Sequence, residues 1–404
     1  MKAAPQKPQK KPKANAAKRR PLVGIAFTQG LAFLEKARRG IVDYANEHGG
    51  WTFLFMPEII GSMVGWLRHT QVDGAFTLVL SPKDRQLARS CAFPVVSLSG
   101  HIAPRATPTV IIDDRGVGRM AAGHLFDLGF KQLGFYGSDT WYSSERHAGF
   151  AAAARQAGVA CKSLLVSMAS SPPDQQRQLE DWLRDLPKPV GILASIDMRA
   201  AMIVNTCAQI GLRVPDDVAV MGVDNDQFVC EQAPVSLTSI VRDDWKTGWE
   251  AAAMLDRLMS GKPIEENPVL IEPVRVESRA STRTLPVSDP FLASLVAEAR
   301  ARIGEPFGVE WFLEHGKCSR RWLETRFRAE LGLTPLAVIN RLRLGKARDL
   351  LVEPESERLR LSDIARQCGF PSQQRFRIVF RKHTGMTPRQ FRREHQHAPG
   401  IAIK

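Results

Sequence analysis

Long hydrophobic runs are missing from this sequence of 404 residues. No window approaches the ~18 consecutive apolar residues of a membrane span, and the charged N-terminus is not followed by the apolar core of a signal peptide. The six cysteines are scattered without a Cys-x-x-Cys pair, which indicates neither a zinc site nor a disulfide framework. We therefore expect a protein of the cytoplasm, without membrane contact, whose cysteines are reduced.

The patterns of catalytic and cofactor sites are missing as well. His101, His124 and His147 have no recognisable metal spacing, and no nucleophile arrangement of Ser, His and Asp is legible. The first candidate strand, residues 22–27, is not followed by the Gly-x-Gly-x-x-Gly of a dinucleotide-binding fold. We expect no enzyme, no metal and no cofactor. The alternative to a non-catalytic protein is that the α/β region is an enzyme or a solute carrier, tethered to DNA by the basic C-terminal segment described below. A turnover assay would reveal the enzyme.

The formal charge of +14 is distributed unevenly along the chain. Residues 317–393 contain 19 Lys and Arg against 7 Asp and Glu, whereas residues 21–316 contain 28 basic and 34 acidic residues. The basic segment near the C-terminus suits a phosphate backbone as its partner. Residues 1–20 have no aromatic residue and no apolar period, so we expect a disordered basic tail that either contacts DNA or only aids solubility.

The stretch Leu361–Arg393 predicts a helix-turn-helix motif. Ser362 could cap a first helix, and Gly369 supplies the left-handed residue of the turn. Phe376 and Phe380, four residues apart, predict the buried face of the second helix. The polar residues on its open face, where they could reach base edges, are Ser372, Gln373, Gln374 and Arg377. An ordinary amphipathic hairpin is the alternative, but the basic surroundings favour DNA binding.

A second copy of this spacing lies upstream and strengthens that interpretation. Residues 308–315 predict a first helix, residues 316–318 a turn, and Ser319–Phe327 the opening of a second helix. Between the two copies, Pro335–Leu351 has apolar residues at helical period and predicts a spacer helix that fixes their separation.

About a quarter of the chain carries phrases that together resemble the DNA-binding domain of the AraC/XylS family. The phrases are SRRWLETRF, LGLTP, INRLRLGKARDLL, DIARQCGF and FRIVFRKHTGMTPRQFR. In that family, two motifs enter successive major-groove segments about 34 Å apart. The residues that would face bases by this resemblance are Arg320, Arg321, Glu324 and Thr325 in the first motif and Gln373, Gln374 and Arg377 in the second. Position 378 departs from the family, which commonly has Arg where this chain has Ile.

From residue 21 to residue 223, short apolar runs alternate with amphipathic helices. The expected strands are 22–27, 51–56, 73–80, 94–99, 109–112, 133–137, 163–166, 190–194 and 218–223, and the expected helices are 34–47, 59–68, 144–157, 174–186 and 199–210. Strands separated by helices of this length favour parallel βαβ units in an open sheet. Two such sets predict two α/β lobes around a hinged ligand-binding cleft.

Several phrases, in the expected order, also resemble the effector domain of LacI-type repressors and periplasmic sugar-binding proteins. They are DDRGVGRMAAGHLFDLGFKQLGFYG, SSERHAGFAAAARQAG, GILASIDMRA, IGLRVPDDVAVMGVDND and LTSIVRDDWKTGWEAAAMLDRLMSGKP. The resemblance spans about residues 22–280 and implies a chain that crosses between the lobes three times. By this resemblance the first lobe comprises about residues 22–137 and 240–280, and the second about 138–239.

We therefore expect a two-lobed α/β periplasmic-binding-protein-like (LacI-type) domain followed by an all-α AraC-type double helix-turn-helix domain. The expected divisions are a basic tail (1–20), the effector-binding domain (21–280), a linker (281–290), the DNA-binding domain (291–395) and a short tail (396–404).

Two residues of the α/β region match ligand-contacting positions of the LacI-type family. Arg146 matches its effector-contacting arginine, and Asp224 matches its carboxylate at the end of a strand, where open α/β sheets bind ligands. Planar, bidentate polar groups of this kind satisfy the vicinal hydroxyls of sugars. The plainer alternative for Arg146 is an ion pair with Glu145 or another surface acid.

Further ligand candidates come from position in the predicted fold. Asp197 follows the strand 190–194, although it could instead cap the next helix. Trp141 and its neighbour Tyr142 could stack on the C–H face of a sugar or pack in the core or hinge. Gln29, after the first strand, could approach from the first lobe, whereas the adjacent acids at 113 and 114 are assigned mainly to helix capping.

This combination implies a transcription regulator controlled by a monosaccharide, with xylose as the first expectation. Ligand would close the cleft and change the spacing of two DNA-binding domains in a homodimer on paired half-sites. By family analogy we expect activation, which makes RNA polymerase an expected partner beside double-stranded DNA, and we expect the protein at the nucleoid. The alternatives are a non-sugar effector or a degenerate cleft that needs no ligand.

Overall fold

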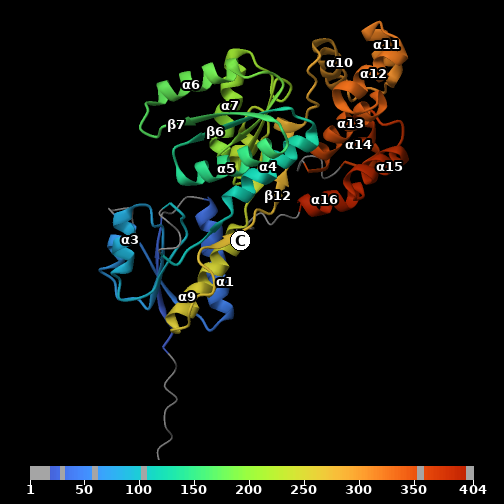
Figure 1. The fold of residues 1–404 in the computed structure, drawn as a ribbon. Helices are drawn as coiled ribbons and strands as arrows, with labels where there is room; N and C mark the ends of the chain where they lie inside the picture. The colour runs from blue at the N-terminus through green and yellow to red at the C-terminus, as the bar shows by residue number, and fades with distance from the viewer. Residues whose placement is uncertain (1–18, 28–31, 57–61, 102–106, 353–358, 397–404) are drawn as a thin grey trace, which may run out of the picture. The chain divides into compact units, whose positions relative to one another are not determined.

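Figure 1 shows the computed structural model, which describes residues 19–27, 32–56, 62–101, 107–352 and 359–396. The chain divides into two compact units, one made of residues 1–111 and 244–269, the other of residues 112–243 and 270–404. It therefore crosses between the units three times, as the resemblance implied. The first crossing lies at residue 111, which corrects the expected boundary near 137. Residues 112–138 belong to the second unit because their helix and strand pack there.

The first unit is built around a four-stranded parallel sheet with strand order β2-β1-β3-β4. Its elements are β1 (Leu22–Ala26), α1 (Ala32–Glu47), β2 (Thr52–Phe55), α2 (Met63–Leu67), β3 (Gly74–Thr77), α3 (Pro82–Arg89), β4 (Val95–Ser97) and α9 (Asp244–Met259). Helices α1 and α9 are far apart in the sequence but pack side by side (Figure 1). The sequence predicted the four strands, α1 and α2, but not α3 or α9.

The second unit contains a six-stranded sheet with strand order β12-β10-β9-β8-β6-β7. Its elements are α4 (Asp114–Leu128), β6 (Gln132–Ser138), α5 (Trp141–Gln156), β7 (Ala160–Val166), α6 (Pro172–Asp185), β8 (Val190–Ala194), α7 (Asp197–Ile210), β9 (Val218–Val223), α8 (Gln227–Gln232), β10 (Thr238–Val241) and β12 (Arg275–Glu277). All neighbouring strands run parallel except β12, which is antiparallel to β10. Every residue of β8 and β9 is buried, as expected for parallel strands covered by helices on both faces.

Two short strands, β5 (Val110–Ile112) and β11 (Val269–Ile271), pair with each other where the chain passes from one unit to the other. A 3-10 helix, Ala280–Thr282, then leads into the C-terminal helices. Residues 285 and 287 are buried in the same hydrophobic cluster as the first of these helices. The segment predicted as a linker thus packs against the domain that follows it.

In the described residues of the C-terminal region, the structure contains seven helices. They are α10 (Pro290–Ala301), α11 (Val309–Gly316), α12 (Arg320–Leu331), α13 (Pro335–Val352), α14 (Leu361–Gln367), α15 (Gln373–Thr384) and α16 (Pro388–Gln396). Helices α11 and α12 form the first predicted motif, and α14 and α15 form the second. The predicted cap of α14 is wrong: Arg360 occupies the N-cap position without a side-chain hydrogen bond, and Ser362 lies inside the helix.

Each motif has its own hydrophobic core, and α13 contributes to both. Val338, Ile339 and Leu342 belong to the core under α11 and α12, whereas Leu344 and Leu351 belong to the core under α14 and α15. A helix that is packed at both ends holds the two motifs at a fixed separation, which is the role predicted for this spacer. In the part of the chain that the structure describes, no helix is long and apolar enough to cross a membrane.

Candidate functional site

The candidate ligand site lies at one edge of the six-stranded sheet, within the second unit. Ser195 directly follows β8, Asp224 directly follows β9, and Arg242 directly follows β10. The carboxyl ends of neighbouring parallel strands meet at one edge, and open α/β sheets bind ligands there. Arg146 reaches the same edge from α5, which follows β6.

Arg146 is the buried centre of this site and is 2% exposed. Its Nε donates to Asp114 Oδ1 at 2.7 Å, its Nη1 donates to the backbone carbonyl of Ser195, and its Nη2 lies 3.8 Å from Asp224 Oδ1. The predicted alternative, a pair with Glu145, is wrong, because Glu145 pairs with Arg115 at 2.6 Å. The guanidinium is thus fixed by a carboxylate and a carbonyl, with one nitrogen directed to Asp224.

Helices α4 and α5 bring Asp114 to Arg146 by packing backbone against backbone. A Cβ atom at Gly118 would lie 2.2 Å from the carbonyl oxygen of Arg146, and one at Gly149 would lie 2.1 Å from that of Arg115. Any side chain at these two glycines would push the helices apart. The close crossing therefore sets the geometry of the buried ion pair.

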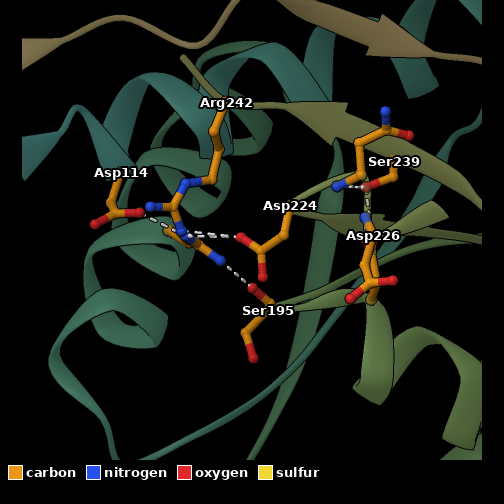
Figure 2. Close-up of polar contacts among 9 residues, drawn as sticks. Asp114, Ser195, Asp224, Asp226, Ser239 and Arg242 are labelled. Atoms are coloured by element: carbon orange, nitrogen blue, oxygen red, sulfur yellow. Dashed lines mark hydrogen bonds and ion pairs between the residues drawn. The ribbon is translucent and has the colours of Figure 1, made fainter. Parts of the chain in front are cut away.

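Asp224 is the most accessible charged group of the site, with 26% of its side chain exposed. Its Oδ1 accepts from Arg242 Nη1 at 2.9 Å. Its backbone has a φ of 106° and that of Asn225 has a φ of 48°, a conformation that non-glycine residues adopt at an energetic cost. Figure 2 shows the Arg242 side chain extending toward the space between Asp114 and Asp224. Such strain at a strand end is a common property of ligand sites.

Asp197 is buried, and its hydrogen bonds go to Ser239 and Asp226 rather than to Arg146. It is the first residue of α7, and its Oδ1 accepts from Ser239 Oγ at 2.6 Å while its Oδ2 accepts from the backbone N–H of Asp226 at 2.8 Å. The alternative of a helix cap is wrong, because no side chain caps α7. Burial, reinforced by the charge of Asp224, raises the pKa of Asp197 to about 7. Asp197 thus supports the loop that carries Asp224 and Asn225.

The remaining predicted ligand residues are Trp141, its neighbour Tyr142 and Gln29. Trp141 is the first residue of α5 and is half-buried, whereas it is the ring of Tyr142 that lies 5.1 Å from Arg146 Cζ, within cation–π distance. Gln29 lies outside the described residues. The role of each as a ligand contact stays a prediction.

Sequence reasoning missed three groups of this site, namely Asp114, Arg242 and Ser195. Asp113 caps α4 by accepting from Gly116 N at 2.8 Å, so the assignment of both adjacent acids to capping holds only for the first. Burial raises the pKa of the Asp114 carboxyl, although the charge of Arg146 opposes this. The sequence could have predicted Arg242, because LTSIV has the apolar pattern of a strand and Arg242 is the first residue after it.

The site offers hydrogen bonds rather than reactive groups. Carboxylates and guanidinium groups alternate around Arg146, and the hydroxyl of Ser195 is buried without a hydrogen-bond partner among the described residues. This set of donors and acceptors fits vicinal hydroxyls. No group of His, Cys, Asp and Glu that could hold a metal ion occurs in the described part of the chain.

The first predicted DNA-reading helix, α12, has Ser319 as its N-cap residue, and the Ser319 hydroxyl accepts from the N–H of Trp322. Arg320, Arg321 and Thr325 are exposed, and Glu324 is half-buried. Arg320 is held by Glu310 of α11 at 2.8 Å, and Thr325 Oγ1 donates to the carbonyl of Arg321 at 2.8 Å. Two of the four predicted side chains therefore have protein partners in this structure.

The second predicted DNA-reading helix, α15, presents its candidates together. Ser372 is the N-cap, and its hydroxyl accepts from Arg375 N at 3.1 Å. The buried face consists of Phe376, Val379 and Phe380, as the spacing of the two phenylalanines predicted. On the opposite face a shallow hollow is lined by Gln373, Gln374, Arg377, Ile378, Arg381 and Thr387.

Comparison with known proteins matches both halves of the chain. A family model described as a periplasmic binding protein-like domain matches residues 122–282, and one described as a helix-turn-helix domain matches residues 314–394. The xylose operon regulatory protein of Haemophilus influenzae is 28% identical over 380 residues, 92% of this chain and 97% of that protein. The protein of the same name from Escherichia coli K12 is 28% identical over 384 residues, 92% of this chain and 96% of that protein.

A solved structure agrees with these relatives. It is described as the xylose-binding transcription activator XylR, has a TM-score of 0.67 and 27% sequence identity, and covers 93% of this chain and 99% of that one. The fold, the strand-end site and the paired motifs thus define a class: a periplasmic-binding-protein-like α/β domain joined to a C-terminal helix-turn-helix domain. Within that class, this chain is homologous to the xylose operon regulatory proteins over nearly its whole length.

Proposed function

We propose that this protein regulates transcription in response to a monosaccharide held by Arg146 and Asp224, with xylose as the first candidate. The observation that carries the proposal is the buried Arg146, fixed by Asp114 and aimed at the partly exposed Asp224 where three strands end. The names of the relatives support xylose. We further propose activation, a homodimer on paired half-sites, contact with RNA polymerase, a cytoplasmic location and no catalytic activity.

The DNA side of the proposal assigns base contacts to both motifs. The proposed residues are Arg320, Arg321, Glu324, Thr325, Ser372, Gln373, Gln374 and Arg377. Replacing Gln373 or Arg377 by Ala should weaken binding to the cognate site by about 1–3 kcal/mol and affect random DNA much less. Equal losses on both DNAs would contradict the assignment.

The sugar side is tested by thermal shift of the full chain against pentoses, hexoses and their phosphates. A ligand at 100 times its dissociation constant should stabilise the protein by about 2.7 kcal/mol. Asp224→Asn keeps the shape of the side chain but removes its charge, so the shift should shrink or disappear. Asp181→Asn, an exposed change on α6, is the control and should keep the full response.

The other outcomes distinguish the alternatives. A shift with none of the sugars would favour a non-sugar effector or a degenerate cleft. A full response in Asp224→Asn would remove that residue from the site. Operator affinity measured with and without the effective sugar then decides whether binding is coupled to DNA recognition.

A further inference from the structure

Ile378 is a large apolar side chain on the open face of α15, where it is 54% exposed. In the described part of the chain, it is not a member of the hydrophobic cluster formed beneath this helix by Phe376, Val379 and Phe380. A β-branched residue lowers helix propensity, and its apolar surface is unfavourable in water. Neither core packing nor helix formation explains an isoleucine here.

The neighbours of Ile378 on the helix surface are polar or cationic. Gln374 precedes it by four residues and Arg381 follows it by three, so the three side chains form one stripe with Arg377 beside them. All four line the same hollow. A partner that meets this surface must offer acceptors for the arginines, polar edges for the glutamine and an apolar group opposite Ile378.

Duplex DNA satisfies all three requirements in the major groove. Among the four bases, the apolar group displayed there is the C5-methyl of thymine. We propose that Ile378 contacts a thymine methyl group in the DNA site and is a specificity-determining residue of the second motif. This inference rests on the proposed function, in which α15 reads base edges.

The test replaces single thymines by deoxyuridine, which pairs with adenine but lacks the methyl group. The probe is a duplex selected from a random library by the full-length protein. At one or two thymines we expect deoxyuridine to weaken wild-type binding about fourfold, the value of burying one CH₂-sized group. Ile378→Ala should bind the thymine duplex correspondingly more weakly and should show no further loss with deoxyuridine at those positions.

A matched control comes from another exposed apolar residue of the same domain. Leu336 of α13 is 47% exposed, and Leu336→Ala should keep the wild-type pattern of deoxyuridine sensitivity. Ile378→Ala replaces an exposed residue by a better helix former, so the variant should fold, which a circular-dichroism melt checks.

Three results would overturn the inference. The first is an equal deoxyuridine penalty in wild type and Ile378→Ala, or no penalty at any thymine. The second is unchanged DNA binding of Ile378→Ala with reduced activated transcription, which would assign Ile378 to a protein partner. The third is failure of the full chain to select any sequence, which would also remove the proposed function, whereas the first two leave DNA recognition intact.

Discussion

Asp113 and Asp114 are adjacent in the sequence but differ in environment. Asp113 caps α4 and forms an ion pair with Arg119, whose side chain is 59% exposed, whereas Asp114 is 5% exposed and pairs with the buried Arg146. Removing one partner of a buried ion pair leaves an uncompensated charge. The two carboxylates should therefore differ in their contribution to stability.

Asp114→Ala should lower the free energy of unfolding by about 3–5 kcal/mol because Arg146 stays buried without its partner. Asp113→Ala, the matched control, should cost only about 1 kcal/mol, the usual value of a helix N-cap. Urea denaturation of both variants measures the difference. Similar losses would mean that the Arg146–Asp114 pair is not a buried structural pair.

Asp197 predicts a pH dependence of stability. Its pKa is raised from 3.8 in the unfolded chain to about 7, so the folded state binds this proton more tightly. The contribution of the protonated Asp197 to the free energy of unfolding is fully present below about pH 4, and it is lost as the pH rises through about 7. Asp197→Asn is neutral at every pH and can still bond to Ser239 and to the N–H of Asp226.

The unfolding free energy of Asp197→Asn, relative to wild type, should therefore increase between about pH 4 and pH 7, by up to about 4 kcal/mol. Denaturant unfolding at several pH values measures this difference. A difference that stays constant across the range would show that Asp197 titrates alike in both states.

Among the single residues of the site, the sequence predicted those that a family pattern singles out and missed those that only folding brings together. Arg146 and Asp224 came from resemblance, and the structure places them 3.8 Å apart. Asp114 could not be distinguished from Asp113, because only the crossing of α4 and α5 buries one of them. The contact from Ser195 uses a backbone carbonyl, which no residue type predicts.

Helix α15 depends on the turn before it, where Gly369 has a φ of 69°. A Cβ atom there would lie 2.6 Å from the carbonyl oxygens of both Ile303 and Glu305, so the left-handed residue also lies against the segment that follows α10. Gly385, which ends α15, has a similar φ of 73°, but among the described residues, its chain neighbours aside, no atom lies within 4 Å of such a Cβ. Substitution at Gly385 therefore tests backbone strain alone, whereas substitution at Gly369 tests backbone strain together with steric contact.

Gly385→Ala should cost about 1–2 kcal/mol, the strain of a left-handed residue with a side chain. Gly369→Ala should cost clearly more and should weaken DNA binding, because the two carbonyls must move. Thermal melts and operator affinity of both variants measure this. Equal losses would mean that the contact with the two carbonyls is loose.

The spacing of apolar residues along the sequence predicted the helices and strands whose own residues show a clear helical or strand period. Predicted helix 34–47 is α1, and predicted strands 190–194 and 218–223 match β8 and β9 residue for residue. The strands β11 and β12 have three residues each and exist only because distant strands pair with them, so no local period predicts them. The lobe boundary failed for the same reason, because it depends on which distant segments pack together.

If the protein works as proposed, the whole molecule must transmit a change in the effector domain to the DNA-binding domain. Arg300 of α10 forms an ion pair with Asp216, in the loop before β9, and donates to Thr284 Oγ1 at 2.9 Å. Thr284 Oγ1 in turn donates to Asp216 Oδ1 at 2.9 Å. This contact joins the strand that carries Asp224 to the first helix of the DNA-binding domain.

Asp216→Ala should therefore reduce the effect of sugar on operator affinity while leaving sugar binding nearly unchanged. A coupling of about 1–3 kcal/mol corresponds to a change of about 5–150-fold in operator affinity, and we expect this ratio to fall several-fold in the variant. Asp217→Ala is the control, because Asp217 pairs with Arg213 in the same loop, at 2.7 Å, and not with α10. Operator titrations with and without saturating sugar measure the ratio. If both variants lose coupling equally, the loop as a whole transmits the signal; if neither does, coupling follows another route than the Arg300–Asp216 pair.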